Sequence, residues 1–439
     1  MTKREALQYI YNRMDHRGLI DTSVEKLLDG EDETLFYALK EADMTMAANG
    51  AIYHKKQGMI GEIVTKFYNE RKAIKKQMLK AKSEYEKHPS PKLKREIGEL
   101  DNNQMAIKIL INSVYGACGN AYFRYYSLEN AEGTTLTGQY IIRYIEKELN
   151  LYLNKLLKTD NEDYVIAIDT DSVYLTLEKL VSSVFNDTSD TDKIVRFLDE
   201  AVSKKIEPYI DKRYSKMCDN LNVFDNRTKM AREAIADRGV WTAKKRYILN
   251  VHNNEGVQYA EPKLKVMGIE AVKSSTPQIV RDKFVKAYRI ILNSTEAELQ
   301  KFVSDFYEEF KSLPAEEVSF PRGVSDIEKW YDSKDLYKKG CPIHVRGALI
   351  FNKLSRKHKL TVEDVKNGSK VKFCYLKMPN PTRENVISFP QFLPKEFELE
   401  NYIDYETQFD KTFKEPLKLV SDAINWNLDK TNTLEGFFS

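Results

Sequence analysis

The 439-residue sequence lacks the long apolar segments that membrane and secreted proteins need. No apolar run approaches the roughly 20 residues of a bilayer-spanning helix. The first residues, Met-Thr-Lys-Arg-Glu-Ala, contain no apolar signal-peptide core. We therefore expect a cytoplasmic protein that has no membrane partner.

Cysteine is also scarce, with four residues in the whole sequence. These are Cys118, Cys218, Cys341 and Cys374, and no two of them are spaced like the ligands of a zinc knuckle or a redox pair. The sequence therefore predicts free thiols in a reducing compartment.

A strong excess of one charge is missing as well. The 69 basic and 66 acidic residues leave a formal net charge of +3, so the overall charge does not identify a nucleic-acid-binding protein. Any such surface must come from local clustering of basic residues. The length and the 42% of hydrophobic residues suffice for two to four folded domains.

The hydrophobic pattern predicts a long helical hairpin in the first third of the chain. One apolar stripe predicts a helix over residues 61–86, and His88-Pro89-Ser90-Pro91 must interrupt it. A second helix is predicted over residues 92–115, and the glycines at 116 and 119 end it. The two helices are therefore expected to pair around a tight, proline-rich tip.

Beyond this hairpin, the predicted strands are concentrated in the middle third of the chain. We expect helices at 136–157, around 192–217, and at 276–292, 297–313 and 401–425, and strands at 164–168, 173–177, 244–251 and 256–264. Residues 1–57 and 339–395 are mixed, and Asn49-Gly50 predicts a turn into a strand. This content predicts an α+β fold.

Asp169-Thr170-Asp171-Ser172 lies between two of the predicted strands. On extended backbone, side chains two residues apart face the same side, so both carboxylates are predicted to project together at a hairpin tip. Two close carboxylates repel each other, and a divalent cation relieves that repulsion. Such a site suits magnesium-assisted phosphoryl transfer. The same four residues also fit an ordinary Asp-rich turn.

Lys108, Asn112 and Tyr115 share one face of the second predicted helix, because they are spaced by four and three residues. A cation, an amide and an aromatic ring in a row can hold a phosphate and a stacked base. Across the hairpin, Arg71 and Lys75 form a basic pair, and these two cations and Lys108 could converge on a polyphosphate. A solvated charged face with a core tyrosine gives the same pattern.

Trp241-Thr242-Ala243-Lys244-Lys245-Arg246-Tyr247 enters a predicted strand. Basic residues interleaved with aromatic ones suit the phosphates and bases of nucleic acids. Basic residues at a strand edge also protect a sheet from aggregation. This segment alone leaves both interpretations open.

In this order, the three segments resemble the family B DNA polymerases. Residues 108–116, Lys-Ile-Leu-Ile-Asn-Ser-Val-Tyr-Gly, match the family's fingers motif, Lys-x-x-x-Asn-Ser-x-Tyr-Gly, at every defined position. Residues 169–172 match its palm motif, and residues 244–247 are similar to the motif that grips the primer duplex. From about Asn49 onward, further stretches are similar to the replicative polymerases of T-even-type bacteriophages: 112–126, 259–268, 273–277 and 341–347.

This resemblance implies the C-terminal part of a right-hand polymerase, with an antiparallel-sheet palm, helical-hairpin fingers and a mostly helical thumb. It divides the chain into an incomplete N-terminal part of the palm (1–57), fingers (58–119), palm (120–268), thumb (269–430) and a clamp-binding tail (431–439). The implied activity is DNA-templated nucleotidyl transfer from dNTP to a primer 3′-hydroxyl in the cytoplasm of a bacterial host. The implied cofactors are two Mg²⁺ ions, with Mn²⁺ as a substitute.

The resemblance also implies a role for each matching residue. Asp171 and Asp169 are implied as catalytic metal ligands, and Glu233 as a further carboxylate beside the metals. Lys108 is implied as the general acid that protonates the leaving pyrophosphate. The implied dNTP-binding residues are Arg71, Lys75, Lys108, Asn112, Tyr115 and Gly116. The implied DNA contacts are Lys244, Lys245, Arg246, Tyr247 and Arg346.

The C-terminal segment Leu434-Glu-Gly-Phe437-Phe438 resembles the Leu-x-x-Phe-Phe core of sliding-clamp-binding tails. Thr431 stands where such tails usually have Gln. A short apolar plug on a polar tail suits a docking peptide, so a sliding clamp is an expected partner. A terminus that folds back on the core is the alternative.

One motif of the family is absent. The other essential Asp of these polymerases lies on a strand with the pattern Asp-x-x-Ser-Leu-Tyr-Pro-Ser, which this sequence lacks, as it lacks the exonuclease carboxylates. Loss of a metal-bridging ligand should remove essentially all activity. We therefore expect a split polymerase, in which an N-terminal subunit supplies the exonuclease and the missing Asp across a large apolar interface. An engineered or truncated fragment beginning at Met1 is the alternative.

Two other functions are open. One is a non-enzymatic polymerase remnant that binds primer–template and clamp, against which the presence of Asp169, Asp171, Lys108 and Tyr115 argues. The other is a different metal-dependent nucleotidyl transferase or nuclease built on the Asp pair. The fingers motif argues against a nuclease, because a nuclease needs no grip on an incoming triphosphate.

Overall fold

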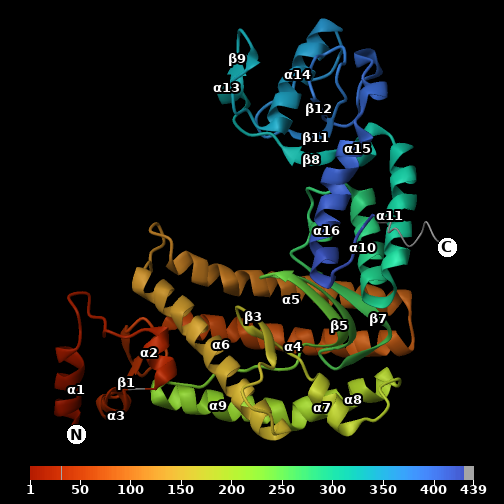
Figure 1. The fold of residues 1–439 in the computed structure, drawn as a ribbon. Coiled ribbons are helices and arrows are strands. Elements are labelled where there is room, and N and C mark those ends of the chain that lie inside the picture. Colours follow the sequence, from red (N-terminus) through yellow and green to blue (C-terminus); the bar gives the residue numbers. More distant parts are fainter. Residues whose placement is uncertain (31, 430–439) are drawn as a thin grey trace. The chain divides into compact units, whose positions relative to one another are not determined.

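The fold combines helices with small antiparallel sheets, which confirms the predicted α+β class (Figure 1). The computed structural model describes residues 1–30 and 32–429. The chain divides into two compact units. The first comprises Met1–Ile235 and His252–Pro262, and the second comprises Ala236–Val251 and the described part of Lys263–Ser439.

The first unit begins with three short helices and a strand pair. The helices are α1 (Lys3–Asn12), α2 (Val24–Asp29) and α3 (Glu33–Ala42), and the antiparallel strands are β1 (Met44–Met46) and β2 (Ile52–His54). Thr2, Ser23 and Asp32 cap the helices, each accepting a hydrogen bond from a backbone N–H of the first turn. The turn predicted at Asn49-Gly50 is confirmed, since β2 follows it directly.

Gly50 in this turn has no room for a side chain. Its φ is +84°, and a Cβ atom there would lie 2.0 Å from the carbonyl oxygen of Ile20. We predict that Gly50→Ala lowers the free energy of unfolding by about 3 kcal/mol, measured by urea denaturation followed by circular dichroism. Gly18→Ala is the matched control, because Gly18 has φ +77° with no atom within 4 Å, and should lose only about 1 kcal/mol. Equal losses would contradict the steric argument.

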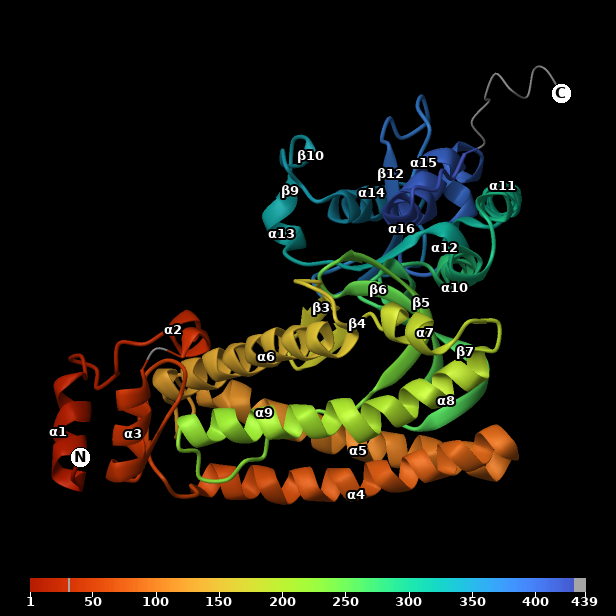
Figure 2. The same ribbon diagram turned by 60° about the horizontal axis from the view of Figure 1, so that its bottom comes forward.

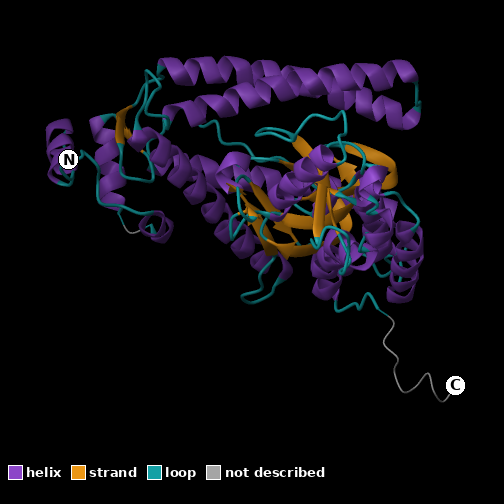
Figure 3. Ribbon diagram, turned by 90° about the horizontal axis from the view of Figure 1, so that it is seen from above, coloured by secondary structure: helices purple, strands orange, loops and turns teal. Residues whose placement is uncertain are grey.

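Two long helices form the predicted hairpin. They are α4 (Met59–Lys87) and α5 (Pro91–Cys118), which lie side by side in Figures 1 and 2 and form the long pair of helices at the top of Figure 3. At the tip, the Ser90 hydroxyl accepts a hydrogen bond from the Leu93 N–H at 3.2 Å, and Pro91 begins α5. The prediction of this hairpin is confirmed.

Helix α6 (Leu128–Leu157) begins eight residues before the predicted start at 136. Ser127 caps it by accepting from the Asn130 N–H at 3.2 Å. Gly133 and the threonines after it weaken the local helical signal. The helix forms there because it packs on the N-terminal turn, where a Cβ at Gly133 would lie 3.1 Å from Asn49 Oδ1. Tertiary packing therefore overrides local propensity.

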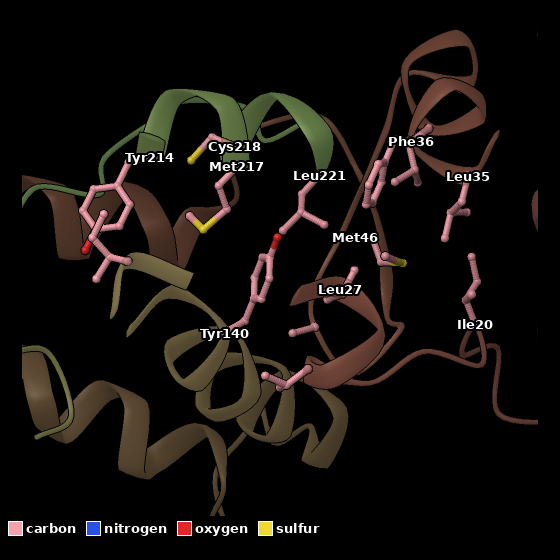
Figure 4. Close-up of a cluster of buried hydrophobic side chains, with 14 of the residues drawn as sticks. Ile20, Leu27, Leu35, Phe36, Met46, Tyr140, Tyr214, Met217, Cys218 and Leu221 are labelled. Atoms are coloured by element: carbon pink, nitrogen blue, oxygen red, sulfur yellow. The ribbon is translucent and has the colours of Figure 1, made fainter. Parts of the chain in front are cut away.

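The remainder of the first unit consists of a strand hairpin and a helical layer. The elements are β3 (Val165–Asp169), β4 (Ser172–Leu175), α7 (Glu178–Val184), α8 (Thr191–Ala201), the π-helical turn η1 (Val202–Ile206) and α9 (Glu207–Asn220). β3 and β4 pair in antiparallel fashion. Figure 4 shows the buried core that joins α2, α3, β1, α6 and α9, with Leu27, Phe36, Met46, Tyr140 and Leu221 among its side chains.

A three-stranded sheet follows, in the order β5-β6-β7. Its strands are β5 (Ala234–Ala243), β6 (Arg246–Asn254) and β7 (Val257–Met267), and the division between the two units passes through all three. We did not predict β5, because Asp237-Arg238-Gly239 are poor strand formers. The predicted strand start at Lys244 is wrong: Lys244 and Lys245 form the turn between β5 and β6.

The second unit contains further helices and a second three-stranded sheet, in the order β12-β11-β8. Its longer elements are α10 (Gln278–Asn293), α11 (Glu296–Lys311), β8 (Phe320–Gly323), α14 (Ile343–Lys357), β11 (Lys370–Tyr375), β12 (Val386–Phe389), α15 (Tyr405–Phe409), η5 (Asp410–Lys414) and α16 (Glu415–Ser421). Short pieces are η2 (Glu270–Val272), α12 (Ala315–Val318), α13 (Ile327–Trp330), β9 (Tyr331–Asp332), β10 (Leu336–Tyr337), η3 (Lys395–Phe397), η4 (Glu400–Tyr402) and η6 (Asp422–Ile424).

Two buried clusters hold the second unit together. One surrounds α14, β11 and β12 and includes Phe351 and Phe389. The other surrounds α10 and α11 and includes Phe284, Phe306 and Phe413, whose rings pack on one another. The helices predicted at 276–292 and 297–313 are confirmed as α10 and α11. Within the described ranges, none of the helices is long and apolar enough to cross a membrane.

Candidate active site

The two predicted carboxylates lie at the tip of the β3–β4 hairpin. Asp169 ends β3, Ser172 begins β4, and these two residues are paired in the register. Thr170 has φ +54°, and the Asp171 N–H donates to the Asp169 carbonyl oxygen at 2.6 Å. The two Asp residues therefore flank a turn rather than alternate along one extended strand, so the alternation argument does not apply to them.

The surroundings of the two carboxylates differ. Asp169 is partly buried, and one of its carboxylate oxygens accepts from the Thr170 hydroxyl at 3.0 Å. Asp171 is exposed, whereas Tyr214 on α9 is buried. Burial raises the pKa of the Tyr214 hydroxyl, and the nearby negative charge of Asp171 raises it further. Asp171 thus faces solvent while its charge acts on a buried group of the core.

Arg71 is held across the helical hairpin by Gln104. The Arg71 Nε–H donates to Gln104 Oε1 at 3.1 Å, and Gln104 Nε2 donates to Asp101 Oδ1 at 2.8 Å. Lys108 is exposed and lies one helical turn after Gln104, on the same face of α5. Because α4 and α5 are antiparallel, Lys75 lies on the tip side of Arg71 and Lys108 on the base side. The three cations therefore follow one another along the hairpin.

Lys75 is engaged by an acidic residue 180 positions away. Its ammonium forms an ion pair with the Glu255 carboxylate, and both side chains are partly buried. Glu255 lies in the turn between β6 and β7 with φ +50°, and its N–H donates to the Glu233 carbonyl oxygen at 2.6 Å. This turn therefore connects the backbone of Glu233, whose side chain is exposed, with one of the predicted triphosphate ligands.

The remaining residues of the fingers motif lie at the end of α5. Asn112 is exposed, and a Cβ at Gly116 would meet no atom within 4 Å, so this part of the helix borders open space. Tyr115 is 47% exposed, and its hydroxyl forms a 2.6 Å hydrogen bond with the Thr135 hydroxyl on α6. This bond fixes the direction of the Tyr115 ring.

The basic segment of the second unit forms a tight turn. Lys244 and Lys245 are exposed there, and Gly268, with φ +63°, approaches so closely that a Cβ would lie 2.1 Å from the Lys245 carbonyl oxygen. Arg246 is partly buried, and Tyr247 is 4% exposed with its ring centroid 5.9 Å from that of Trp241. The two lysines are accessible to a ligand, whereas the Tyr247 side chain is part of the packing.

Arg346 lies at the start of α14 in the second unit. One terminal nitrogen donates to Asn385 Oδ1 at 2.5 Å, and the guanidinium lies over the Tyr337 ring at 5.6 Å from its centroid. Tyr337 in turn donates to Glu384. The predicted contact of Arg346 with DNA stays a prediction. The predicted clamp-binding residues Leu434, Phe437 and Phe438 lie outside the described residues.

The carboxylates suit magnesium by chemistry but are few in number. Asp169 and Asp171 offer the hard oxygen donors that Mg²⁺ prefers. Over the part of the chain that the structure describes, no three His, Cys, Asp or Glu side chains come together in a group that could hold a metal ion. Asp169 and Asp171 are therefore two candidate ligands and not a complete metal site among the described residues.

Sequence reasoning missed several residues that shape this region. Gln104 and Asp101 continue the stripe of Lys108, Asn112 and Tyr115 backward with spacings of four and three, so the helical period could have identified them. Glu255 and Thr135 carry no such signal, because they reach the site only through tertiary folding. The interactions of Lys75 and Tyr115 were therefore not predictable from local sequence.

Comparison with known proteins identifies the family of this chain. Residues 20–422 match the model of DNA polymerase family B. The DNA-directed DNA polymerase of Enterobacteria phage T4 is 37% identical over 351 residues, covering 77% of this chain and 39% of that protein. Its counterpart from Escherichia phage RB69 is 33% identical over 446 residues, covering 89% of this chain and 49% of that protein.

A more distant relative is DNA polymerase 2 of Aeropyrum pernix, which is 27% identical over 358 residues and covers 79% of this chain and 35% of that protein. The chain thus spans less than half the length of these relatives. The family match nevertheless extends over most of its residues and includes the carboxylate turn and both helices of the hairpin. This chain therefore belongs to DNA polymerase family B.

Proposed function

We propose that this chain carries the centre of template-directed DNA synthesis, in which a primer 3′-hydroxyl attacks the α-phosphorus of a dNTP and pyrophosphate leaves. The observation that carries the proposal is the row of Lys75, Arg71 and Lys108 along one hairpin, in the same unit as the exposed Asp171. Cations in a row suit a triphosphate, and carboxylates suit the metal that accompanies it.

Each residue of the row has a distinct task in this proposal. Arg71 binds phosphate oxygens through its two terminal nitrogens, and Lys75 and Lys108 neutralise charge as compact ammonium groups. Lys108 also transfers a proton to the oxygen of the leaving pyrophosphate as its bond to the α-phosphorus breaks. Tyr115, with its ring direction set by Thr135, and Asn112 and Gly116 line the pocket of the new base pair.

Asp169 and Asp171 would hold the two Mg²⁺ ions, with Glu233 nearby, and Mn²⁺ would substitute. Bound metal would increase the acidity of the primer hydroxyl and neutralise charge on the phosphates. The protein's own contribution is a turn that presents an exposed Asp171 without using its carboxylate in a hydrogen bond within the described structure.

We further propose that residues 58–119 act as fingers, 1–57 and 120–268 as palm, and 269–430 as thumb.

We also propose that a second polypeptide supplies a further carboxylate and the exonuclease. The pair Asp169 and Asp171 is not part of any larger described carboxylate group, and the sequence has no Asp-x-x-Ser-Leu-Tyr-Pro-Ser segment. A two-metal clamp needs more ligands than two side chains offer. The exposed Lys244 and Lys245, together with Arg246 and Arg346, are proposed to contact primer–template, and residues 431–439 a sliding clamp. The predicted contact of Tyr247 with DNA is not proposed again, because its side chain is buried against Trp241.

Primer extension tests this proposal. The chain is assayed with Mg²⁺ and dNTPs, alone and mixed with the part of the RB69 phage relative that this chain does not match. Extension that occurs in the mixture, but not with the chain by itself, would support the two-polypeptide enzyme. Extension by the chain alone would refute the need for a second polypeptide. Tight primer–template binding without extension in any mixture would favour a DNA-binding remnant.

The ion pair of Lys75 with Glu255 makes a prediction for substrate affinity. Lys75 must leave the Glu255 carboxylate before it binds a phosphate, so removing that charge favours the substrate. We predict that Glu255→Gln lowers the KM for dNTP roughly threefold, the size expected for one partly exposed pair. Glu261→Gln, an exposed acidic residue of the same strand hairpin, is the control and should change nothing. An unchanged or raised KM in Glu255→Gln would contradict the idea that Glu255 and the substrate phosphate compete for Lys75.

A further inference from the structure

Gln104 is a buried polar side chain inside the helical hairpin. It is 5% exposed, and it is the one residue of α5 that is buried. A buried amide is unfavourable unless its polar atoms are hydrogen-bonded, so an apolar residue would pack a simple hairpin at lower cost. The presence of glutamine here therefore points to a task beyond packing.

The amide of Gln104 has one direction that satisfies both neighbours. A carboxylate accepts hydrogen bonds and does not donate them, so Asp101 requires the NH₂ group of Gln104 on its side. The bond from Gln104 Nε2 to Asp101 Oδ1 is 2.8 Å long. The carbonyl oxygen is then directed to Arg71, whose Nε–H donates to it at 3.1 Å. Asp101 thus orients Gln104, and Gln104 orients Arg71.

Gln104 binds the Nε atom of Arg71, which is the nitrogen that contributes least to phosphate binding. With Nε fixed, the plane of the guanidinium is set, and its two terminal nitrogens make no hydrogen bond to any residue of the described structure. These two nitrogens form the fork that binds phosphate oxygens in pairs. Arg71 is held in this way, whereas Lys75 is paired with Glu255 and Lys108 is exposed.

We propose that Gln104, oriented by Asp101, is a positioning residue that holds the Arg71 guanidinium ready for the phosphates of the incoming nucleotide. This inference rests on the proposed function, since it gives Arg71 a triphosphate to bind. It adds a pair on α5, the buried Gln104 and the partly buried Asp101, that determines affinity without touching substrate. Gln104 and Asp101 act only through Arg71, so their effect must disappear when Arg71 is removed.

The test measures binding of inorganic tripolyphosphate to the full chain by titration calorimetry, which requires no turnover. Gln104→Met keeps the volume and the helix propensity of the side chain but removes both hydrogen bonds. We expect Gln104→Met to weaken binding about tenfold and Arg71→Ala about thirtyfold. Losses of this size correspond to the free energy that hydrogen bonds to charged groups contribute. The double variant should bind like Arg71→Ala alone. Asn103→Ala, at an exposed neighbour on α5, should bind like the wild type.

A conservative pair of variants separates positioning from mere support of the fold. Asp101→Asn retains an oxygen that can accept from Gln104 and should bind within twofold of the wild type, whereas Asp101→Ala should lose about fivefold. Urea midpoints are measured for every variant. If Gln104→Met weakens binding equally with and without Arg71, Gln104 acts on the fold and the inference is overturned. Wild-type affinity in Gln104→Met overturns it as well.

The same titrations separate this inference from the proposed function. If the wild type binds tripolyphosphate and Arg71→Ala weakens that binding, the triphosphate role of the hairpin stands whatever Gln104→Met does. If Arg71→Ala binds as tightly as the wild type, the proposed function of the cation row fails, and the positioning role of Gln104 fails with it.

Discussion

Asp171→Asn is expected to reduce nucleotide incorporation by at least about a thousandfold while leaving the fold intact. Loss of a negative ligand removes several kcal/mol of transition-state stabilisation by the metal, and each 1.4 kcal/mol is about tenfold in rate. The fold should persist because the hairpin turn is closed by the Asp171 backbone N–H, not by its carboxylate. The asparagine side chain has nearly the same shape.

The measurement is single-nucleotide primer extension with Mg²⁺, using this chain together with its proposed N-terminal partner. Asp160→Asn is the control, since Asp160 is an exposed carboxylate in a loop before β3 and should keep full activity. Circular dichroism should be the same for both variants. An Asp171→Asn protein that retains more than about a tenth of the activity would show that this carboxylate is not a catalytic ligand.

Lys108→Ala is expected to lower kcat by roughly a hundredfold to a thousandfold, the range of general acid catalysis. Lys108 is exposed on α5, one turn from Gln104, so its ammonium is free to reach a leaving group. Lys108→Arg separates its two proposed tasks, which are binding of phosphate and donation of a proton. Arginine keeps the positive charge but does not release a proton near neutral pH. We therefore expect Lys108→Arg to retain the KM for dNTP within about threefold while its kcat falls like that of Lys108→Ala.

Rapid-quench incorporation assays over a range of dNTP concentrations give both constants. Lys94→Ala is the control, because Lys94 is an exposed cation at the start of the same helix. This substitution should leave both kcat and KM unchanged. If Lys108→Arg has a wild-type kcat, the residue supplies charge alone and the proton comes from another group.

Much of the first unit could be predicted from its sequence because the signals are local. The stripes of the hairpin helices, the breaking segment at 88–91 and the apolar runs around Asp169 and Asp171 each depend on a few neighbouring residues. Strand β5 and the first turns of α6 could not be predicted in this way. Both contain weak formers of their own structure and depend on packing against distant segments.

The candidate site shows the same division. Its candidate residues could be proposed from sequence because motifs on single elements carry them, as Lys108 to Gly116 do on α5. Their partners were not, because Glu255 contacts Lys75 across 180 positions and Gln104 contacts Arg71 across 33. The turn at Thr170 also changed the local geometry, since φ +54° there ends the alternation that the strand pattern suggested. Local sequence thus suggests candidate site residues but does not predict which distant side chains hold them.

The most direct test of the central claim uses a primer–template with one templating base and each dNTP in turn. Wild-type chain with its proposed N-terminal partner and Mg²⁺ should add only the complementary nucleotide, and Asp171→Asn should add none. Extension that persists in Asp171→Asn would place the catalytic centre elsewhere. Mg²⁺-dependent shortening of the primer that requires no dNTP and depends on Asp171 would instead make the Asp pair the centre of a nuclease.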